Sequence, residues 1–365
     1  MILAGLKRKQ LDNMLVFRPV RFDDLPAIEH LAITAGNSMT TLPNNRDHLE
    51  QLINNTAQSL RNKVSLASKQ SYHFVIEDSV TKEVLGISGI EACVGYTSPF
   101  YSYYCEQLEH HSQELQINNV IDTLSLNQDY EGASRLYTFF LTPDIDSKND
   151  EGNALQLLSL SRLMFIGQQP KRFNNKFVLE LQGLLTSDNE SPFWQALGQH
   201  FFNMDFHRAN YLSGINAKGF IADLMPKHPV YVPLLEKPAQ QAIGQLRPDL
   251  NSIKELLMDQ GFKHRHYISI FDAGPAFECL TANIAAINNQ YHASVQLTNL
   301  YAQSDAKPAL ISNNKVKDFK AIIATIDITM SQQAQTVQLT TEQATCLGVT
   351  TGDRVYILAL TQAEH

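Results

Sequence analysis

The segment 137–168 places the strongest constraint on what this chain can fold into. A β-branched and aromatic run at 137–143 is followed by a polar loop that holds Gly152 and Ala154, and then by an amphipathic helix at 155–168. This order predicts a strand, a loop with free backbone N–H groups, and the positive end of a helix dipole. Such a loop binds anions, above all phosphates, because glycine lets the backbone approach a ligand closely. The alternative is a tight strand-to-helix connection without a ligand.

Composition narrows the class of protein. The chain has 365 residues, 44% of them hydrophobic and 18% charged, which is typical of a globular protein of two or three domains. With 29 basic and 37 acidic residues, nucleic acid is not an expected partner. No run of 18 apolar residues predicts a membrane span. The first ten residues place their charges after a very short apolar stretch, the reverse of a secretory signal. We therefore expect a cytoplasmic protein, with residues 1–13 as an extension before Met14.

Neither metal nor redox chemistry is expected. The four cysteines lie far apart without a Cys-x-x-Cys pair, which favours free thiols in a reducing cytoplasm. The 12 histidines include no His-x-x-x-His pair beside a carboxylate on a helix. We predict no metal site.

Alternating elements fill the first 213 residues. Strands are expected at 15–20, 72–78, 84–94, 136–141, 176–182 and 201–206, with helices at 23–32, 48–60, 155–168 and from the Ser191 cap onward. Residues 95–131 read as an insertion of hairpin character. This order, together with the loop at Gly152, resembles an acyl-CoA N-acyltransferase domain at 14–213. The resemblance implies an α+β fold, a mixed sheet flanked by helices, and a loop that holds the pyrophosphate of coenzyme A.

Two further units follow. A helix near 253–258 that ends at Gly261 and passes into a strand suggests a second, degenerate acyltransferase-like half at 214–300. Short alternating strands near 320–328, 336–340 and 354–360, with a helix at 341–348, suggest a small β-barrel-like module at 315–365. The polar stretch 303–314 reads as the linker between them.

Several strings resemble the arginine N-succinyltransferase family of bacterial arginine catabolism. They include Ser191-Pro-Phe-Trp, Leu224-Met-Pro-Lys-His-Pro and Ile270-Phe-Asp-Ala-Gly-Pro. The resemblance implies transfer of a succinyl group from succinyl-CoA to the α-amine of arginine, with succinyl-CoA as a co-substrate and no permanently bound cofactor. Some members act on ornithine, and some are paired subunits, so we expect a homo- or hetero-oligomer.

Three positions depart from the family pattern. The family's proton donor is a histidine in Ile-Gly-Gln-Val-His-Pro, but this chain has Arg247 there, and an arginine does not exchange protons near neutral pH. Arg247 can still polarise a carbonyl or hold a carboxylate. The family's leucine contact to succinyl-CoA falls on Phe139. Asn149 replaces an arginine of the loop, which removes one cation from the pyrophosphate site.

The candidate site residues follow from this chemistry, which requires a deprotonated amine, a polarised thioester carbonyl and a proton for the leaving thiolate. Glu91 is a candidate base, directly or through water, unless it pairs with a neighbouring cation. His228 is a candidate proton donor in place of the histidine that Arg247 replaces, unless it only completes a turn between Pro226 and Pro229. Candidate contacts to coenzyme A are Phe139, Leu141, Asn149, Gly152, Asn153 and Ala154, with N–H groups expected where the strand at 139–141 splays from its neighbour.

Four charged residues are candidates to contact the charged groups of the substrates. Arg162 lies inside an apolar helix and must meet a carboxylate of the protein or of the succinyl group. Asp205 and Asp272 are candidate partners for the guanidinium of arginine, although turn capping is an equal alternative for both. Glu180 is a substrate-contact candidate and a second candidate base beside Glu91, unless it pairs with a neighbouring cation. Two other functions stay open: acyl transfer to another amine, and a non-catalytic subunit that binds coenzyme A.

Overall fold

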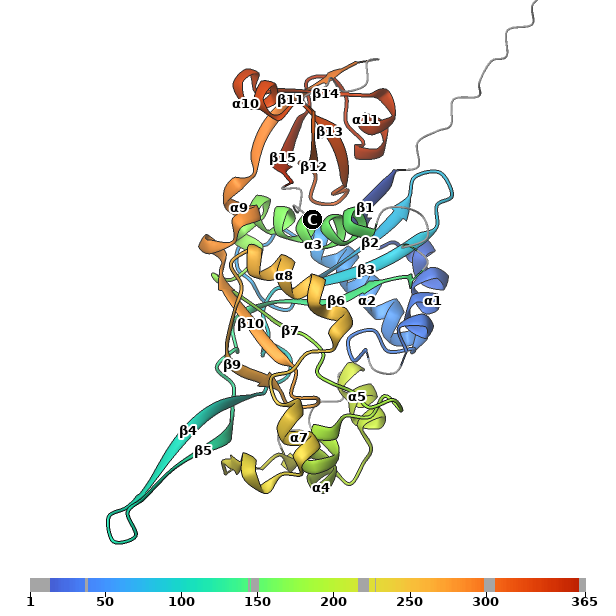
Figure 1. Ribbon diagram of the computed structural model, residues 1–365. Coiled ribbons are helices and arrows are strands. Elements are labelled where there is room, and N and C mark those ends of the chain that lie inside the picture. The colour runs from blue at the N-terminus through green and yellow to red at the C-terminus, as the bar shows by residue number, and fades with distance from the viewer. Residues whose placement is uncertain are drawn as a thin grey trace, which may run out of the picture.

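The computed structural model describes residues 14–36, 39–143, 145, 151–215, 223–226, 228–298 and 306–360, without the side chains of 151 and 152. Its strands form one continuous mixed sheet (Figure 1) in the order β14-β11-β15-β12-β13-β1-β2-β3-β6-β7-β10-β9-β4-β5-β8. The strands are β1 Leu15–Pro19, β2 Ser71–Asp78, β3 Val84–Glu91, β4 Ser102–Ser112, β5 Ile117–Asn127, β6 Ser134–Leu141, β7 Lys176–Glu180, β8 Val230–Tyr231, β9 Lys263–Ser269, β10 Pro275–Leu280, β11 Tyr291–Leu297, β12 Lys307–Asn313, β13 Ala321–Ile326, β14 Thr336–Leu339 and β15 Arg354–Ala359. The helices are α1 Leu25–Ala35, α2 Arg46–Arg61, α3 Glu151–Gln168, α4 Gln199–Phe202, α5 Phe206–Gly214, α7 Lys237–Ala242, α8 Asn251–Asp259, α9 Ala285–Asn289, α10 Ile328–Ala334 and α11 Thr341–Leu347.

Helices cover both faces of the first part of the sheet. In β2, Phe74 and Ile76 belong to the core that contains α3, whereas Val75 between them packs with α1 and α2. This alternation is the two-residue period of a strand with both faces buried. The hairpin of β2 and β3, predicted at 72–78 and 84–94, is confirmed as an antiparallel pair.

Helix α3 lies at the centre of the molecule. Every residue from 157 to 166 is buried, so the helix is enclosed nearly all round rather than amphipathic as the sequence suggested. One side packs on β2 and β3, and another meets Leu310 and Phe319 of the C-terminal region in the same core. The segment that the sequence placed beside the candidate ligand loop is thus the most deeply buried helix.

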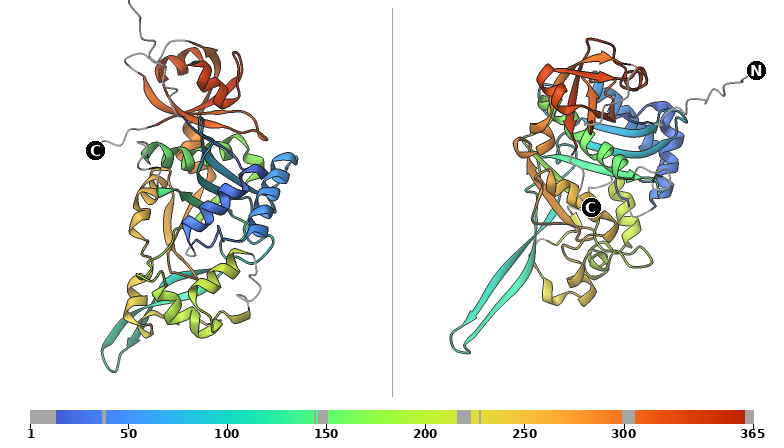
Figure 2. Two further views of the ribbon diagram at one scale, coloured as in Figure 1. Left: turned by 90° about the vertical axis from the view of Figure 1, so that its right-hand side faces the viewer. Right: turned by 45° about the horizontal axis from the view of Figure 1, so that its top comes forward.

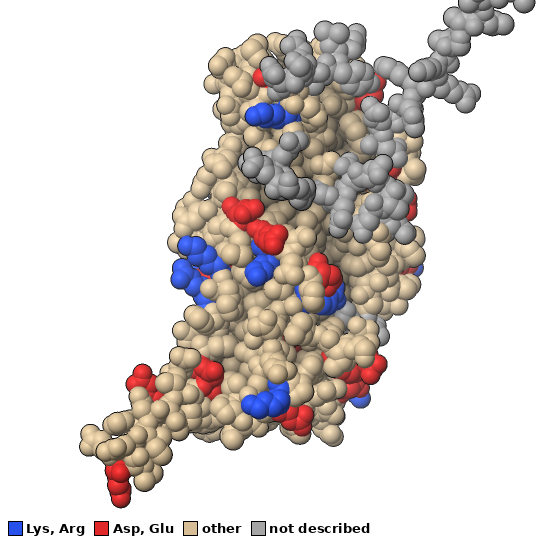
Figure 3. Space-filling model, viewed as in Figure 1, with Lys and Arg blue, Asp and Glu red and all other residues tan. Residues whose placement is uncertain are grey.

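A long hairpin projects from the body, as expected for 95–131. The strands β4 and β5 pair antiparallel along their whole length, from Ser102↔Asn127 to Ser112↔Ile117. Beyond Cys105 and Leu124 the arm belongs to none of the described hydrophobic cores. It carries acidic side chains but no lysine or arginine between 102 and 127 (Figure 3). Two further views show it at the end of the molecule opposite the C-terminal strands (Figure 2).

The C-terminal strands β11 to β15 enclose a separate core with α11. Its members include Val295, Ile311, Ile322, Val337 and Leu347. The expected helix at 341–348 is confirmed as α11, which ends at Gly348 with a φ of +66°. The linker expected at 303–314 is wrong from Lys307 onward. Those residues form β12, a strand between β13 and β15, because its alternate apolar side chains fill this core.

The strand expected at 201–206 is also wrong. Helix α4 ends at Phe202, Asn203 takes the left-handed conformation with a φ of +48°, and α5 begins at Phe206. Asp205 caps α5, since its carboxylate accepts a hydrogen bond from the backbone N–H of Arg208 at 2.7 Å. The expected cap at Ser191 is confirmed, because its hydroxyl accepts from the backbone N–H of Trp194 at 3.0 Å.

Candidate active site

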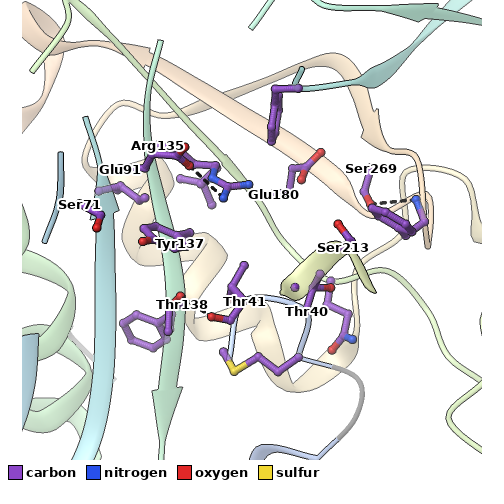
Figure 4. Close-up of a pocket in the computed structure, with 18 of the residues that line it drawn as sticks. Thr40, Thr41, Ser71, Glu91, Arg135, Tyr137, Thr138, Glu180, Ser213 and Ser269 are labelled. Atoms are coloured by element: carbon purple, nitrogen blue, oxygen red, sulfur yellow. Dashed lines mark hydrogen bonds and ion pairs between the residues drawn. The ribbon is translucent and has the colours of Figure 1, made fainter. Parts of the chain in front are cut away.

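The parallel strands β6 and β7 separate soon after they begin. Their register covers only Ser134↔Phe177 and Arg135↔Val178, so among the described residues the rest of β6 has no strand partner on that side. A cavity of about 660 Å³ lies at this opening, lined by residues 135–140 of β6 and 179–182 at the end of β7 (Figure 4). The splay that the sequence predicted near 139–141 is therefore present, and it begins at Leu136.

A β-bulge lies in β6 at the same place. The register with β3 shifts between Ile87↔Phe140 and Gly89↔Tyr137, so Thr138 and Phe139 oppose one residue. Thr138 has a φ of +48°, which is unusual and costly for a β-branched residue. Its hydroxyl donates to the carbonyl of Thr41 at 3.1 Å. The bulge changes the direction of the backbone at Thr138 and Phe139, in the wall of the cavity. Bulges are common beside active sites, where they redirect the chain.

Glu91 is held in an ion pair. Ser71, Glu91 and Arg135 stand opposite one another in β2, β3 and β6, so their side chains share one face. Glu91 Oε2 lies 3.0 Å from Arg135 Nη2. The Arg135 guanidinium also lies over the rings of Phe100 and Tyr137, at 5.1 and 4.9 Å. The pairing that the sequence left open as an alternative for Glu91 is the observed one.

The next row on this face contains His73, Gly89 and Tyr137. A Cβ on Gly89 would lie 2.9 Å from Tyr137 Cε1 and 3.1 Å from His73 Nε2, so both rings pack against its bare Cα. Burial, with a smaller contribution from neighbouring His48, lowers the pKa of His73 to about 3. His73 and His48 both line the cavity, and the sequence analysis selected neither. The available signal was a histidine inside an otherwise apolar strand.

Arg162 reaches the cavity from α3. Its side chain is buried, with Nη1 3.5 Å from the carbonyl of Gly89 and the guanidinium 5.1 Å from the centre of the Phe139 ring. Arg162 Nε has no hydrogen-bond partner, and no described carboxylate pairs with this guanidinium. Burial lowers the pKa of Arg162 to about 9, so it stays charged at neutral pH. A buried, unpaired cation at a cavity wall favours an anionic ligand.

Arg247 stands at the rim beyond β7. Its Nε and Nη2 bind the two carboxylate oxygens of Asp249, both at 2.6 Å, and its Nη1 donates to Gln182 Oε1 at 2.6 Å. The hydrogen bond from Arg247 lowers the pKa of Asp249. Glu180 lies on the same wall, with its carboxylate toward the cavity (Figure 4). Opposite charges thus line one cavity, which suits a ligand that carries both cationic and anionic groups.

Several sequence-selected residues lie elsewhere or in supporting positions. His228 is exposed and Asp205 caps a helix, and neither lines the cavity. Asp272 lines it, but its carboxylate accepts from the backbone N–H of Gly274 at 3.0 Å, and burial raises its pKa. Leu141 at the end of β6, and Asn153 and Ala154 in the first turn of α3, lie outside the lining. The loop predicted to hold Gly152 and Ala154 is wrong from residue 151 onward, because α3 already begins there. Asn149 lies outside the described residues, and of Gly152 only its place in the first turn of α3 is described.

The described part of the chain also bears on metal, thiol and membrane-spanning features. No group of three or more His, Cys, Asp or Glu side chains there is arranged to hold a metal ion. The four cysteines are free thiols. No helix of that part has the length and apolar character of a membrane span.

Comparison with known proteins shows what the chain is similar to. Residues 15–286 match the family "Arginine N-succinyltransferase beta subunit", and residues 292–359 match its C-terminal domain. Proteins named arginine N-succinyltransferase from Escherichia coli strain 55989 and from Shigella flexneri are each 39% identical over 351 residues, covering 96% of this chain and 99% of theirs. A solved structure from Pseudomonas aeruginosa, described as arginine/ornithine succinyltransferase subunit AI, is 33% identical with a TM-score of 0.84. It covers 96% of this chain and all of its own.

Proposed function

The chain belongs to the arginine N-succinyltransferase family, and we propose that the cavity between β6 and β7 transfers a succinyl group from succinyl-CoA to the α-amine of L-arginine. The reaction forms an amide bond at the amine, breaks the thioester C–S bond and releases coenzyme A as its thiol. It belongs to arginine catabolism. Ornithine is a second acceptor to test, since the Pseudomonas aeruginosa relative carries both names.

The observation that carries the proposal is the unpaired Arg162. A succinyl group differs from an ordinary acyl group by its terminal carboxylate, and a buried guanidinium with a free donor edge is the group that binds a carboxylate best. Arg162 has no protein carboxylate to satisfy it among the described residues. We assign Arg162 to the succinyl carboxylate, with Phe139 packed against its guanidinium.

The edge of β6 that separates from β7 supports a position for the thioester of succinyl-CoA. Strand N–H groups that lack a ladder partner are donors for a carbonyl oxygen whose charge grows in the transition state. The bulge at Thr138 and Phe139 directs the backbone there. We propose that the thioester carbonyl lies at this bulge and that coenzyme A extends past Leu141 to the segment Asn149 to Ala154, whose residues from 151 onward form the first turn of α3. There the N-terminus of α3, with Gly152 and Asn153, faces the pyrophosphate.

The acidic side chains of the cavity support a position for the acceptor, arginine. We propose that Glu180 binds the guanidinium of arginine and that Asp272 shapes this end of the cavity through its turn. The ion pair with Arg135 makes Glu91 a fixed carboxylate that binds a water or the amine. Arg247 is assigned to charge stabilisation at the rim. Asp205 and His228 receive no role in the reaction, since neither lines the cavity.

The finer fold assignment belongs to the same proposal. We propose an acyl-CoA N-acyltransferase-like unit at 14–213, supported by the parallel, splayed pair β6 and β7 joined through α3. The second half at 214–300, the extension at 1–13 and the module at 315–365 stay predictions. Since β11 and β12 pair with β13, β14 and β15, a module that begins near Tyr291 is favoured over one that begins at 315. Cytoplasmic location and oligomeric state also stay predictions.

A thiol-release assay tests the function. Purified protein is mixed with succinyl-CoA and arginine, ornithine or no acceptor, and the product is identified by mass. We expect thiol release that depends on arginine and yields N-succinylarginine. Release with a different amine alone would favour the related acyltransferase, and tight coenzyme A binding without turnover would favour the non-catalytic subunit.

Substitution of Arg162 tests the assignment that carries the proposal. Arg162→Met should lower kcat/KM for succinyl-CoA by about 10²-fold or more, because the succinyl carboxylate then enters a buried site without a partner. Butyryl-CoA lacks that carboxylate, so its slow turnover should change little and the preference for succinyl-CoA should shrink. The exposed Arg46→Met serves as the control. An unchanged preference in Arg162→Met would remove Arg162 from the acyl site.

A further inference from the structure

We propose that Arg135 binds the α-carboxylate of the acceptor, so that the Arg135–Glu91 ion pair selects α-amino acids over amines that lack a carboxylate. The inference rests on the proposed function of the cavity and names a substrate contact within it. The sequence analysis did not select Arg135.

Arg135 projects into the opening between β6 and β7. It is the last residue of β6 that pairs with β7, opposite Val178, and it lines the cavity. Its guanidinium is directed across the opening, to the side on which Glu180 lies (Figure 4). It lies over the ring of Tyr137, which directly precedes the bulge at Thr138. The charge is therefore carried by the same strand that forms the proposed thioester site.

Glu91 uses only part of this guanidinium. Its Oε2 lies 3.0 Å from Arg135 Nη2, and no other carboxylate pairs with Arg135 in the part of the chain that the structure describes. The N–H groups of a guanidinium lie in its plane, so the rings of Phe100 and Tyr137 hold the group without occupying these donors. Nε is buried without a hydrogen bond, whereas the side chain as a whole is 12% exposed. A carboxylate in the cavity is therefore expected at the outer nitrogen, Nη1.

The other cations of the cavity are engaged, exposed or assigned. The described lysine and arginine side chains that line it are Lys69, Arg135, Arg162 and Arg247. All three nitrogens of Arg247 already bind protein side chains, and Lys69 is exposed. Arg162 is proposed for the succinyl carboxylate. The reaction brings two substrate carboxylates together, so the second one needs a second cation.

The two cations reach the cavity from opposite faces of the sheet. The row that contains Arg135 lies on the face that α2 covers, since His73 on that face contacts Thr56 of α2. Arg162 belongs to α3, which packs on the other face. The acyl group and the acceptor meet only at the thioester carbon. Separate cations on separate faces therefore keep the two carboxylates apart.

The ion pair matches the charges of an amino acid. An α-amino acid carries its amine and its carboxylate on one carbon, and the pair offers a carboxylate and a guanidinium side by side. With the α-carboxylate on Arg135, the α-amine comes to lie beside Glu91. An amine without a carboxylate satisfies Glu91 but leaves the outer edge of Arg135 without a partner, so the pair discriminates against it.

Calorimetric titration tests the contact without turnover. Agmatine is arginine without its α-carboxylate, and 5-guanidinopentanoate is arginine without its α-amine. Arg135→Gln should weaken binding of arginine and of 5-guanidinopentanoate by about 10- to 100-fold, the range of a hydrogen bond to a charged group. It should not weaken binding of agmatine, which has no carboxylate to lose a partner. An equal loss for agmatine, or no loss for 5-guanidinopentanoate, would overturn the inference.

A double variant separates direct binding from charge repulsion. Arg135→Gln also leaves Glu91 without its cation, and a lone carboxylate repels a substrate carboxylate. Glu91→Gln combined with Arg135→Gln removes that repulsion and should still bind 5-guanidinopentanoate at least about 10-fold more weakly than wild type. Recovery of wild-type affinity in the double variant would refute the contact. Arg135→Lys keeps the ion pair but not the second donor edge, so it replaces Arg135→Gln if that variant unfolds. It should lose affinity in the same direction, and the exposed Arg46→Gln is the control.

Kinetics distinguish this inference from the proposed function. In thiol release, the ratio of kcat/KM for arginine to that for agmatine should fall at least about 10-fold in Arg135→Gln, while KM for succinyl-CoA changes little. The ratio should persist in Arg162→Met. If Arg162→Met abolishes it and Arg135→Gln does not, the acceptor carboxylate binds Arg162 and the inference is wrong. Ligand binding as expected without thiol release would remove the proposed function and keep the Arg135 contact. Turnover without a preference for the carboxylate would do the reverse.

Discussion

Arg247 is held rigidly at the position where the family pattern has a histidine. Asp249 binds two of its nitrogens and Gln182 a third. A guanidinium in this state stabilises negative charge but transfers no proton near neutral pH. The arrangement favours an electrostatic role at 247, with the thiolate of coenzyme A leaving without a dedicated acid.

Replacement by histidine tests that reading. In Arg247→His, the imidazole stands beside Asp249, whose negative charge raises its pKa above the usual value of about 6.5. We expect kcat to be kept or raised, and a new fall in kcat as pH rises through that pKa, since the acid form is then lost. A pH profile of thiol release measures this. If Arg247→His and Arg247→Ala both keep wild-type kcat without a new pH effect, position 247 has no electrostatic role in the reaction.

Single residues were predictable where their chemistry was visible in the chain. Arg162 was selected because a cation inside an apolar helix is expensive, and its guanidinium is buried at the cavity without a carboxylate partner among the described residues. His73 was missed because its neighbours Tyr72, Phe74 and Val75 dominate the strand pattern. Only the cross-strand row with Gly89 and Tyr137 places His73 at the cavity wall, and register between strands is not visible in the sequence of any one strand.

Elements were predictable when local pattern and tertiary packing agreed. The β2–β3 hairpin, the arm and α11 carry turn or cap signals at their ends. The apolar residues at 201–206 mimic a strand period, but Asn203 and Asp205 end one helix and cap the next. Pro308 made β12 look like a linker. It is tolerated because pairing with β15 begins only at Ala309, so the proline stands near the start of the strand.

The N-terminus of α3 is the element whose role in binding coenzyme A can be tested. Gly152 lies in its first turn, where an added carboxylate favours the helix but repels a pyrophosphate. Gly152→Glu should therefore keep or slightly raise thermal stability while weakening coenzyme A binding by at least about 10-fold. Gly152→Ala adds a methyl group without charge and should bind more tightly than Gly152→Glu. Calorimetric titration with coenzyme A measures both, and equal affinity in the two variants would move the pyrophosphate elsewhere.

The whole molecule is joined through α3. The C-terminal strands have their own core, yet Phe319 lies in the core of the body, in edge contact with the rings of Phe17, Phe74 and Phe165 at 6.1, 6.2 and 5.1 Å. Gln168 at the end of α3 donates to Ser312 of β12 at 2.8 Å. The sheet also continues from β1 to β13 through Phe17↔Ala321. Sequence patterns suggested a C-terminal module but could not show that these strands help to enclose the central helix.

Phe319→Ala tests whether body and module unfold together. Loss of a buried phenylalanine typically costs about 3–5 kcal/mol, so Tm should fall by roughly 5–10 °C. Because Phe319 joins the two cores, we expect one calorimetric transition in the variant as in the wild type. Leu339→Ala, which opens a cavity inside the module's own core, is the matched comparison and should shift the same transition. Two separate transitions, with only the lower one moved by Leu339→Ala, would show that the module is an independent unit. Coenzyme A binding should then survive melting of the module, whereas a joined molecule loses it at the single Tm.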